Sequence, residues 1–342
     1  MAIKSLAWMV RVFEPPVYCY HEIVHNQVVV DRFRQLGVVF VDDVLEVPPG
    51  RPLMLSAHGS APEVVAAARE AGGVVVNAVC PLVTKVHHEV KLRASKGYSV
   101  LYVGHRGHEE AVGTMAVAPG SIFLVESVDE VLGVPDPGGP VAFLAQTTLA
   151  VDEWRSILEA AQERWPELWV PPRSDLCFAT TNRQAALRAV AGRCDAMVVI
   201  GSANSSNTLA LVRTAKAAGC PRVVRVNQAA EVPDDLAGTV GVIAGASAPE
   251  SLVQDVVAAL APRVGAEEVV AVPEDEYFPL PRELRELLRN LAGALAVLGF
   301  APPAAEGGPG PGRGDPGATA PATRSAFDGR DVPAAHVLAA LG

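Results

Sequence analysis

The sequence predicts an α/β fold that is built from several small parallel sheets. Short, continuously apolar runs such as PLMLSA, YSVLYVG and AMVVIGS are each followed by a polar loop and then by a stretch with helical spacing. This strand–loop–helix unit recurs about six times before residue 270, and apolar strands that alternate with helices are typical of parallel sheets covered on both faces. We therefore expect several small α/β layers and not one long barrel.

Polar residues follow the first two expected strands. The strand near Val17 leads into HEIVHN, which contains His25, and PLML leads into SAHG, which contains His58. Ligands of open parallel sheets bind at the carboxyl ends of the strands, so these loops are candidate binding segments. HEIVHN also fits a continued strand with outward-facing polar residues, in which a histidine would have a structural role.

Cys80 lies between the expected strand GVVVNAV and an expected helix that begins at Pro81. Proline suits the first helical position because its missing N–H would have no partner there, and apolar residues recur after it at helical spacing. The positive end of the helix dipole favours a thiolate, which predicts metal ligation or nucleophilic attack. The alternative is a small, buried apolar residue.

Two loops further along the chain carry histidine, carboxylate and hydroxyl groups. YSVLYVG is followed by GHRGHEEAVGT, with His108 and Glu110, and PVAFLA is followed by QTT, with Thr147. Paired histidines beside a carboxylate rarely serve packing alone, so we expect this segment to be functional. The histidines form no H-E-x-x-H pattern, and the sequence therefore predicts no zinc site. It also lacks a nucleotide-binding P-loop and a dinucleotide fingerprint.

Cys177 occupies a second position at the start of an expected helix, in DLCFATTNRQAALRAV. Single cysteines at helix starts, one per α/β unit, suit an iron–sulfur cluster at the junction between units. The other three cysteines lie within or beside expected strands, and we interpret them as structural: Cys19, Cys194 and Cys220.

The last two expected strands lead into GSANSSNT and GASAPE, which place hydroxyl and amide groups at helix starts. Together with free N–H groups of the helices, such side chains suit a phosphate or a diphosphate. A loop with a helix N-cap and no ligand explains GSANSSNT as well. The candidates in these loops are Ser205, Ser206, Asn207 and Ser247.

Composition excludes several classes of protein. The chain has 342 residues, 50% of them hydrophobic, and a formal net charge of −10. The acidic balance argues against binding to nucleic acid or to an anionic membrane surface, and no apolar run reaches the roughly 20 residues of a spanning helix. Five thinly spread cysteines and no secretory signal indicate a reducing, cytoplasmic setting.

The segments above resemble one family, the 4-hydroxy-3-methylbut-2-enyl diphosphate reductases, from about Met1 to Arg285. The motifs that carry the resemblance stand in the same order: PPVYCYHEIVHN, SAHG, CPLVTKVH, GHRGHEEAVGT, QTTL, CFATTNRQ, GSANSSN and GASAPE. The resemblance implies three small parallel-sheet α/β units in a trefoil around a central cavity. It also implies an oxygen-sensitive 4Fe–4S cluster and the last step of the methylerythritol phosphate pathway, in which an allylic diphosphate loses its C4 hydroxyl to give isopentenyl and dimethylallyl diphosphate.

The resemblance also implies limits for the units. We expect a first α/β unit at 1–80 that is N-terminally incomplete and completed by about 266–285, a second at 81–176 and a third at 177–265. An extra helix is expected at 286–300. A Pro- and Gly-rich tail at 301–342 is expected to be disordered, because it has too few large apolar residues to offset its ordering entropy. A short helix is expected in its PAAHVLAALG segment.

Roles carry over to the matching positions. The resemblance implies Cys80 and Cys177 as cluster ligands, and an electron donor such as ferredoxin or flavodoxin as a partner. It implies Glu110 as the proton source, Thr147 as the group that orients the substrate hydroxyl, and His108 beside them. The residues implied to bind the small-molecule diphosphate substrate are His25, His58, His108, Thr147, Ser205, Ser206, Asn207 and Ser247.

The chain departs from the family most near its N-terminus, where the first strand of the first unit is absent too. The family carries a third cluster cysteine in a Cys-x-Gly-Val turn near its N-terminus, and this sequence has no such turn. MAIKSLAWMVRVFEPPVY resembles the helix that follows the turn, so we expect an internal methionine to have been taken as the start of a longer chain. The rival expectation is a two-cysteine paralogue. Two functions stay open: the reductase, and a non-catalytic diphosphate-binding protein without a stable cluster.

Overall fold

Three parallel sheets follow one another along the chain in the computed structural model, which describes residues 1–71, 73–273 and 278–297. The first sheet has the order β2-β1-β3-β4 and contains β1 (Val17–Tyr20), β2 (Val38–Val41), β3 (Leu53–Leu55) and β4 (Val75–Asn77). The second has the order β6-β5-β7 and contains β5 (Ser99–Val103), β6 (Ile122–Val125) and β7 (Val141–Ala145). The third has the order β10-β8-β9 and contains β8 (Ala196–Ile200), β9 (Val223–Val226) and β10 (Val240–Ala244).

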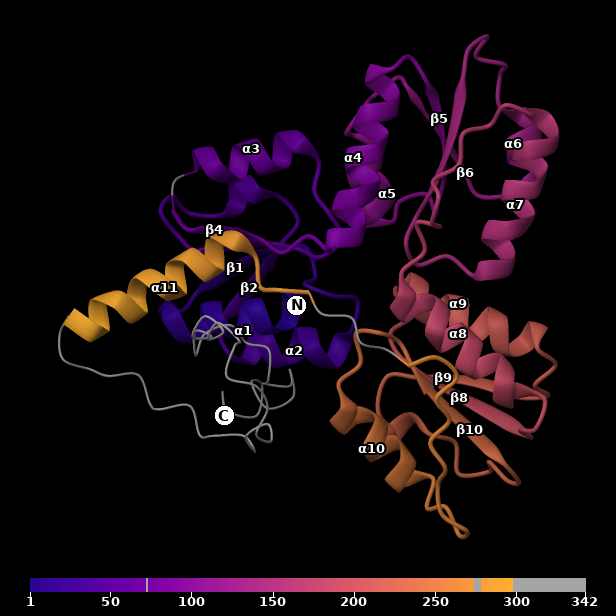
Figure 1. Ribbon diagram of the computed structural model, residues 1–342. Coiled ribbons are helices and arrows are strands. Elements are labelled where there is room, and N and C mark those ends of the chain that lie inside the picture. Colours follow the sequence, from indigo (N-terminus) through magenta and orange to yellow (C-terminus); the bar gives the residue numbers. More distant parts are fainter. Residues whose placement is uncertain (72, 274–277, 298–342) are drawn as a thin grey trace, which may run out of the picture.

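Helices connect the strands, and each sheet with its helices forms one of three units (Figure 1). The helices are α1 (Ala2–Val12), α2 (Gln27–Gln35), α3 (Pro62–Glu70), α4 (Pro81–Ser95), α5 (Glu109–Met115), α6 (Val128–Gly133), α7 (Val151–Arg164), α8 (Phe178–Ala191), α9 (Ser206–Ala217), α10 (Glu250–Ala259) and α11 (Arg282–Val297). Two short 3₁₀ turns are η1 (Val44–Glu46) and η2 (Ala229–Glu231).

All strand pairings of these three sheets are parallel. In β7 and β8 every residue is buried, as the unbroken apolar runs at these positions predict for strands covered on both faces. The prediction of three small parallel-sheet α/β units is thus confirmed.

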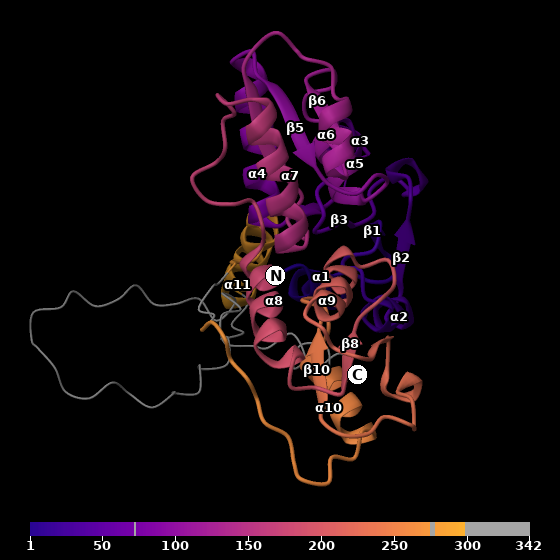
Figure 2. The same cartoon turned by 90° about the vertical axis from the view of Figure 1, so that its right-hand side faces the viewer.

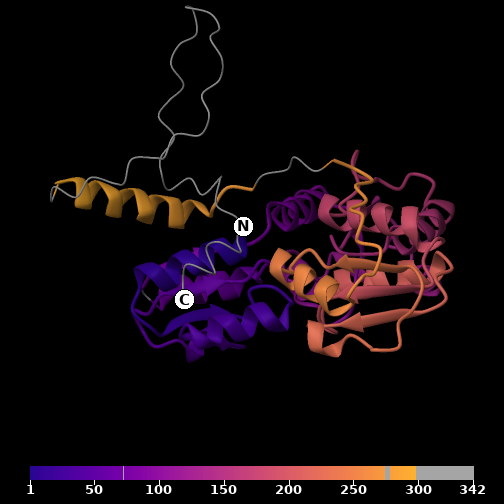
Figure 3. The same ribbon diagram turned by 90° about the horizontal axis from the view of Figure 1, so that it is seen from below.

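The first unit takes part of its core from the far end of the described chain. Leu280, Leu284 and Leu288, in and just before α11, are buried in one apolar cluster with Leu6 and Met9 of α1. Figure 3 shows α11 lying along this unit, and it contacts β4. The limits of the three units and the central cavity stay predictions. Residues 298–300 of the expected extra helix, and the whole expected tail, lie outside the described residues.

Hydrogen bonds join the loops that follow strands of different units; Figure 2 shows the three units turned by 90° from the first view. The backbone N–H of Gln27 in the first unit donates to Oγ of Ser202 in the third, 2.8 Å away. Cys177 N–H donates to Thr147 O at 2.8 Å, which ties the start of α8 to the end of β7. None of the helices in the described residues combines the length and apolar character that a membrane crossing needs.

Candidate active site

Three imidazoles from three separate loops lie together. The rings of His25 and His58 stack with centroids 4.0 Å apart, and the ring of His108 meets both edge-on, at 5.3 and 5.9 Å. His25 follows β1, His58 follows β3 and His108 follows β5. The structure therefore brings together all three histidines that the sequence singled out.

The segment HEIVHN is a loop, so its alternative interpretation as a continued strand is wrong. β1 ends at Tyr20, and His21 has φ 57°, a left-handed conformation that turns the chain out of the sheet. Asn26 then caps α2, because its Oδ1 accepts a hydrogen bond from Val29 N–H at 3.1 Å. The turn and the cap fix His25 between them.

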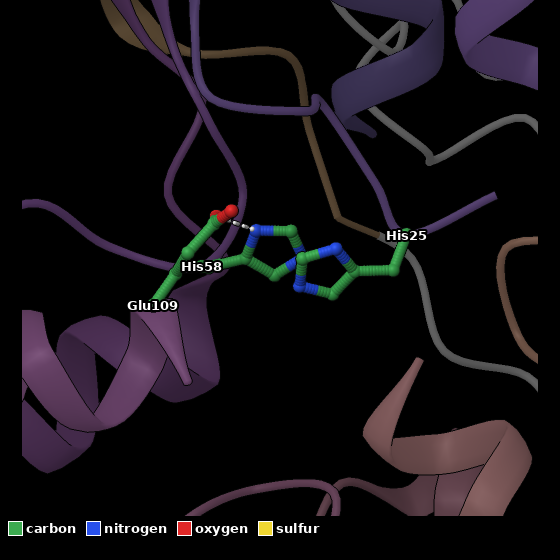
Figure 4. A group of neighbouring side chains, drawn as sticks. All are labelled: His25, His58 and Glu109. Atoms are coloured by element: carbon green, nitrogen blue, oxygen red, sulfur yellow. Dashed lines mark hydrogen bonds and ion pairs between the residues drawn. The ribbon is translucent and has the colours of Figure 1, made fainter. Parts of the chain in front are cut away.

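Two carboxylates that the sequence analysis did not single out pair with these histidines. Glu109 Oε2 lies 2.6 Å from Nδ1 of His58, and Glu22 Oε2 lies 3.2 Å from Nδ1 of His25 (Figure 4 shows the first pair). Each carboxylate accepts from Nδ1–H and leaves Nε2 of its imidazole for another partner. Asn204 of the third unit holds Glu22 in turn, through Nδ2 to Oε2 at 2.9 Å.

Burial and pairing set the charge of the His58–Glu109 pair. Burial lowers the pKa of His58, although the bond to Glu109 opposes this shift. Burial also opposes ionisation of Glu109, but its bond to His58 and the charge of that ring outweigh burial, so the pKa of Glu109 is lowered. Glu109 is therefore an anion beside a neutral imidazole at neutral pH.

Close packing of two backbones places this pair. Gly113 of α5 lies against the loop that carries His58: a Cβ at Gly113 would come 2.7 Å from the carbonyl oxygen of Gly59. Gly59 itself has φ 88°, which favours glycine. Glycine at both positions lets α5 approach the loop and bring Glu109 to His58.

His108 caps α5 with its own side chain. Its Nδ1 accepts from Glu110 N–H at 3.2 Å, so this imidazole carries its proton on Nε2. Burial, with the nearby rings of His58 and His25, lowers the pKa of His108 to about 3. His108 is thus a neutral donor at its Nε2 across the physiological range.

Glu110 is the most strongly perturbed carboxyl group of the site. Its side chain is buried, and both oxygens bind Thr147: the backbone N–H at 2.8 Å from Oε1 and the hydroxyl Oγ1 at 3.0 Å from Oε2. Burial raises the pKa of Glu110 to about 7, against the lowering effect of these two bonds. A carboxyl group that titrates near neutral pH suits proton transfer.

The start of α9 brings the third unit to the site. Ser205 caps this helix through a bond from Thr208 N–H at 3.3 Å, as the capping interpretation predicts. Ser206 Oγ accepts from Gln146 Nε2 at 3.2 Å and donates to Nδ1 of His105 at 3.3 Å. These bonds join α9 to the loops after β5 and β7.

Several buried polar atoms of the candidate residues are unpaired within the described part of the chain. Both side-chain polar atoms of Asn207 and Nε2 of His25 are buried without a hydrogen-bond partner there. Ser247 lies next to this region, since its Oγ donates to the carbonyl oxygen of His25 at 3.2 Å. Buried polar groups are rarely left unpaired in native proteins, so the orphaned atoms point to a ligand.

Cys80 and Cys177 stand at the N-cap positions of α4 and α8, and neither side chain makes a capping hydrogen bond. The backbone N–H groups at the start of each helix favour the thiolate and lower the pKa of each thiol. Burial, the largest cause, raises the pKa of Cys177 to about 11, and the nearby Cys80 adds to the shift. Burial likewise raises the pKa of Cys80.

Cys80 is also tied to the histidine loops, because its backbone N–H donates to Ala57 O, next to His58, at 3.0 Å. The remaining cysteines, Cys19, Cys194 and Cys220, are buried in the apolar clusters of the first and third units. The donor set thus holds two thiols at helix N-termini, where burial outweighs the dipole effect that the sequence predicts and keeps both protonated in the free protein. It is one thiol short of the three that the family resemblance implies.

The fold and these residues define a class: a three-unit α/β protein whose strand-end loops join a buried acid, three imidazoles and two helix-capping cysteines. Comparison with known proteins agrees. The family model described as LytB protein matches residues 1–261. A 4-hydroxy-3-methylbut-2-enyl diphosphate reductase of Cereibacter sphaeroides is 45% identical over 293 residues, 83% of this chain and 92% of that protein. One of Paracoccus denitrificans is 46% identical over 292 residues, with the same two coverages.

A solved structure matches as well. That of the E-1-hydroxy-2-methyl-but-2-enyl-4-diphosphate reductase from Plasmodium falciparum superposes with a TM-score of 0.79 at 30% identity, covering 85% of this chain and 93% of that one. The chain belongs to the LytB family of 4-hydroxy-3-methylbut-2-enyl diphosphate reductases.

Proposed function

We propose that this protein is a reductase that converts 4-hydroxy-3-methylbut-2-enyl diphosphate to isopentenyl and dimethylallyl diphosphate. The overall reaction replaces the C4 hydroxyl by hydrogen, takes up two electrons and two protons, and releases water. The single observation that carries the proposal is the buried Glu110, which Thr147 holds at both oxygens and whose pKa is raised to about 7. Family membership gives this acid its proposed task.

In this proposal Glu110 donates a proton to the C4 oxygen so that the hydroxyl leaves as water. Thr147 fixes the orientation of Glu110 through its hydroxyl and backbone N–H, and this positioning lowers the barrier to proton transfer. His108 presents Nε2–H beside them, because its Nδ1 is occupied by the N–H of Glu110.

The proposed diphosphate site consists of imidazoles and the start of α9. Glu22 and Glu109 already orient the rings of His25 and His58 through Nδ1, and Nε2 of each ring donates to a phosphate oxygen once it has taken up a proton. The N–H groups at the start of a helix favour phosphate. The proposed partners from the third unit are Ser205, Ser206, Asn207 and Ser247.

Cys80 and Cys177 are the proposed ligands of a 4Fe–4S cluster. The cluster would supply the two electrons, and its proposed source of electrons is a small donor protein such as ferredoxin or flavodoxin. Because two thiols do not complete the implied three-cysteine set, no step of the proton chemistry above is assigned to the cluster.

The test uses the full chain after anaerobic reconstitution with iron and sulfide, with the diphosphate substrate and a chemical reductant. We expect product formation in the parent chain. It should be lost in Glu110→Gln, which still binds the substrate. Equal product formation in Glu110→Gln would overturn the role of Glu110. Absence of product in the parent chain would overturn the reductase proposal.

The incomplete set of cysteine ligands also favours a second candidate function, that of a non-catalytic diphosphate-binding protein. Its supporting observation is that the other three cysteines are all buried in apolar clusters, away from the pair. This candidate predicts tight binding of the substrate by a reconstituted chain that holds neither sulfide nor visible colour. A coloured, sulfide-containing protein that turns over would exclude it.

A further inference from the structure

We propose that His25, His58 and Glu109 form a binding site for a zinc ion. One ligand atom from each of the three side chains lies within 4.8 Å of the others (Figure 4). Two imidazoles and one carboxylate, with a further position left for water, are the donor set of several zinc sites. The proposed reductase reaction uses no zinc, and the zinc proposal does not rest on that reaction.

The distances require only a small closure. Ligand atoms about 2.0–2.1 Å from a tetrahedral zinc ion lie about 3.3 Å from one another. The ligand atoms start within 4.8 Å of one another, so their separations change by about 1.5 Å or less to reach this spacing. The rings of His25 and His58 stack at 9°, so one ring must also turn to direct its nitrogen at the ion.

The unpaired nitrogen of His25 is an independent indication of a ligand. Its Nε2 is buried and has no hydrogen-bond partner in the described part of the chain. Its Nδ1 is bound to Glu22, 3.2 Å away. A histidine that donates one N–H to a carboxylate and turns its other nitrogen to an ion is the usual arrangement at zinc sites, because the carboxylate fixes the ring and raises its basicity.

The site combines the two kinds of ligand that zinc takes here, imidazole and carboxylate. No short sequence motif contains the set, since the three residues follow three different strands, and the sequence analysis therefore predicted no zinc site.

A bound ion would occupy the same imidazoles that the proposed diphosphate contacts. Zinc would then act as an inhibitor that keeps the substrate out. Zinc binding itself is measured without substrate, iron or sulfide, so its failure would leave the reductase proposal untouched.

The test measures zinc affinity by equilibrium dialysis on the full, untagged chain. Cys80→Ser and Cys177→Ser are introduced first, because two thiols would bind zinc on their own. In this background we expect one zinc per chain, and a cobalt(II) spectrum without thiolate charge transfer. Glu109→Gln should weaken zinc binding by about tenfold or more. The matched control is Glu89→Gln, since the side chains of Glu89 and Glu109 are 22% and 20% exposed.

A second variant, His25→Gln, should weaken zinc binding to a similar degree, and thermal unfolding checks that each variant is folded. Zinc affinity that is unchanged in Glu109→Gln or in His25→Gln overturns the site, as does a parent chain that binds no zinc.

Discussion

Glu109 Oε2 lies 2.6 Å from Nδ1 of His58, and the two residues belong to different units of the protein. Glu109 stands in the first turn of α5, and His58 follows β3. The contact gives the imidazole a fixed orientation, and it places a negative charge behind a ring whose other nitrogen is the proposed contact to a diphosphate.

Diphosphate binding should be accompanied by proton uptake. The pKa of His58 is lowered by burial in the free protein, and a bound anion would raise it, because an opposite charge favours the imidazolium form. Between the pKa of His58 in the free protein and its pKa in the complex, the affinity for diphosphate falls as pH rises. Titration calorimetry with inorganic diphosphate, in buffers of different ionisation enthalpy, measures the protons taken up. We expect fewer in Glu109→Gln, and an equal number would contradict the prediction.

Glu110 should make the folded protein less stable as pH rises. The folded state holds this proton up to a pKa of about 7, whereas the ordinary value is 4.5. The folded protein binds more protons between these values, so the free energy of unfolding falls with pH, by up to about 3 kcal/mol. Denaturant unfolding at about pH 5 and about pH 8 should show Glu110→Gln gaining stability over the parent at the higher pH. An equal difference at both pH values would refute this.

Replacement of Thr147 by valine should raise the pKa of Glu110 further. The substitution removes the hydroxyl that donates to Oε2 at 3.0 Å and keeps the backbone N–H at Oε1. In the parent protein this bond stabilises the ionised form of Glu110. Its loss therefore raises the pKa of Glu110, and the alkaline limb of the pH–rate profile should move to higher pH. Thr148→Val, the same change one residue further on, should leave that limb in place. A shift of equal size in both variants would argue against a specific Thr147–Glu110 interaction.

Gly113→Ala should destabilise the protein by about 1–3 kcal/mol, as is usual for overpacking. The added Cβ would meet the backbone oxygen of Gly59 at 2.7 Å and push α5 away from the loop of His58. Gly133→Ala is the matched control, because Gly133 also lies in a helix and nothing lies within 4 Å of its added Cβ. Thermal unfolding of the two variants, compared with the parent, measures the difference. Equal stabilities would show that α5 tolerates the closer contact.

Local sequence signals were enough to place much of this site. Pro81 after Cys80 marks a helix start, and polar residues after apolar runs mark strand ends; the structure has a helix and a turn at these points. The pattern could not show which strand ends meet, because that depends on how the three sheets pack against one another. The shared location of His25, His58 and His108 is therefore a finding of the structure.

Glu22 and Glu109 escaped the sequence analysis for a related reason. A carboxylate on a loop or in the first turn of a helix is common, and only its partner makes it unusual. One signal was present: Glu109 and Glu110 are adjacent in a helix, so their side chains point about 100° apart. If Glu110 faces Thr147, Glu109 must face another element, and that element is the loop of His58.

The contact of Ser247 with the backbone of His25 joins residues that are 222 positions apart in the chain. Loop-closure entropy makes such distant pairings form late in folding. Each sheet, in contrast, is closed by strands that are near neighbours in the sequence. A ribosome-bound chain that has not yet released Ser247 would also still hold back Leu280, Leu284 and Leu288, which complete the core of the first unit. Neither the site nor the first unit would then be complete, so such a chain would be chemically inert.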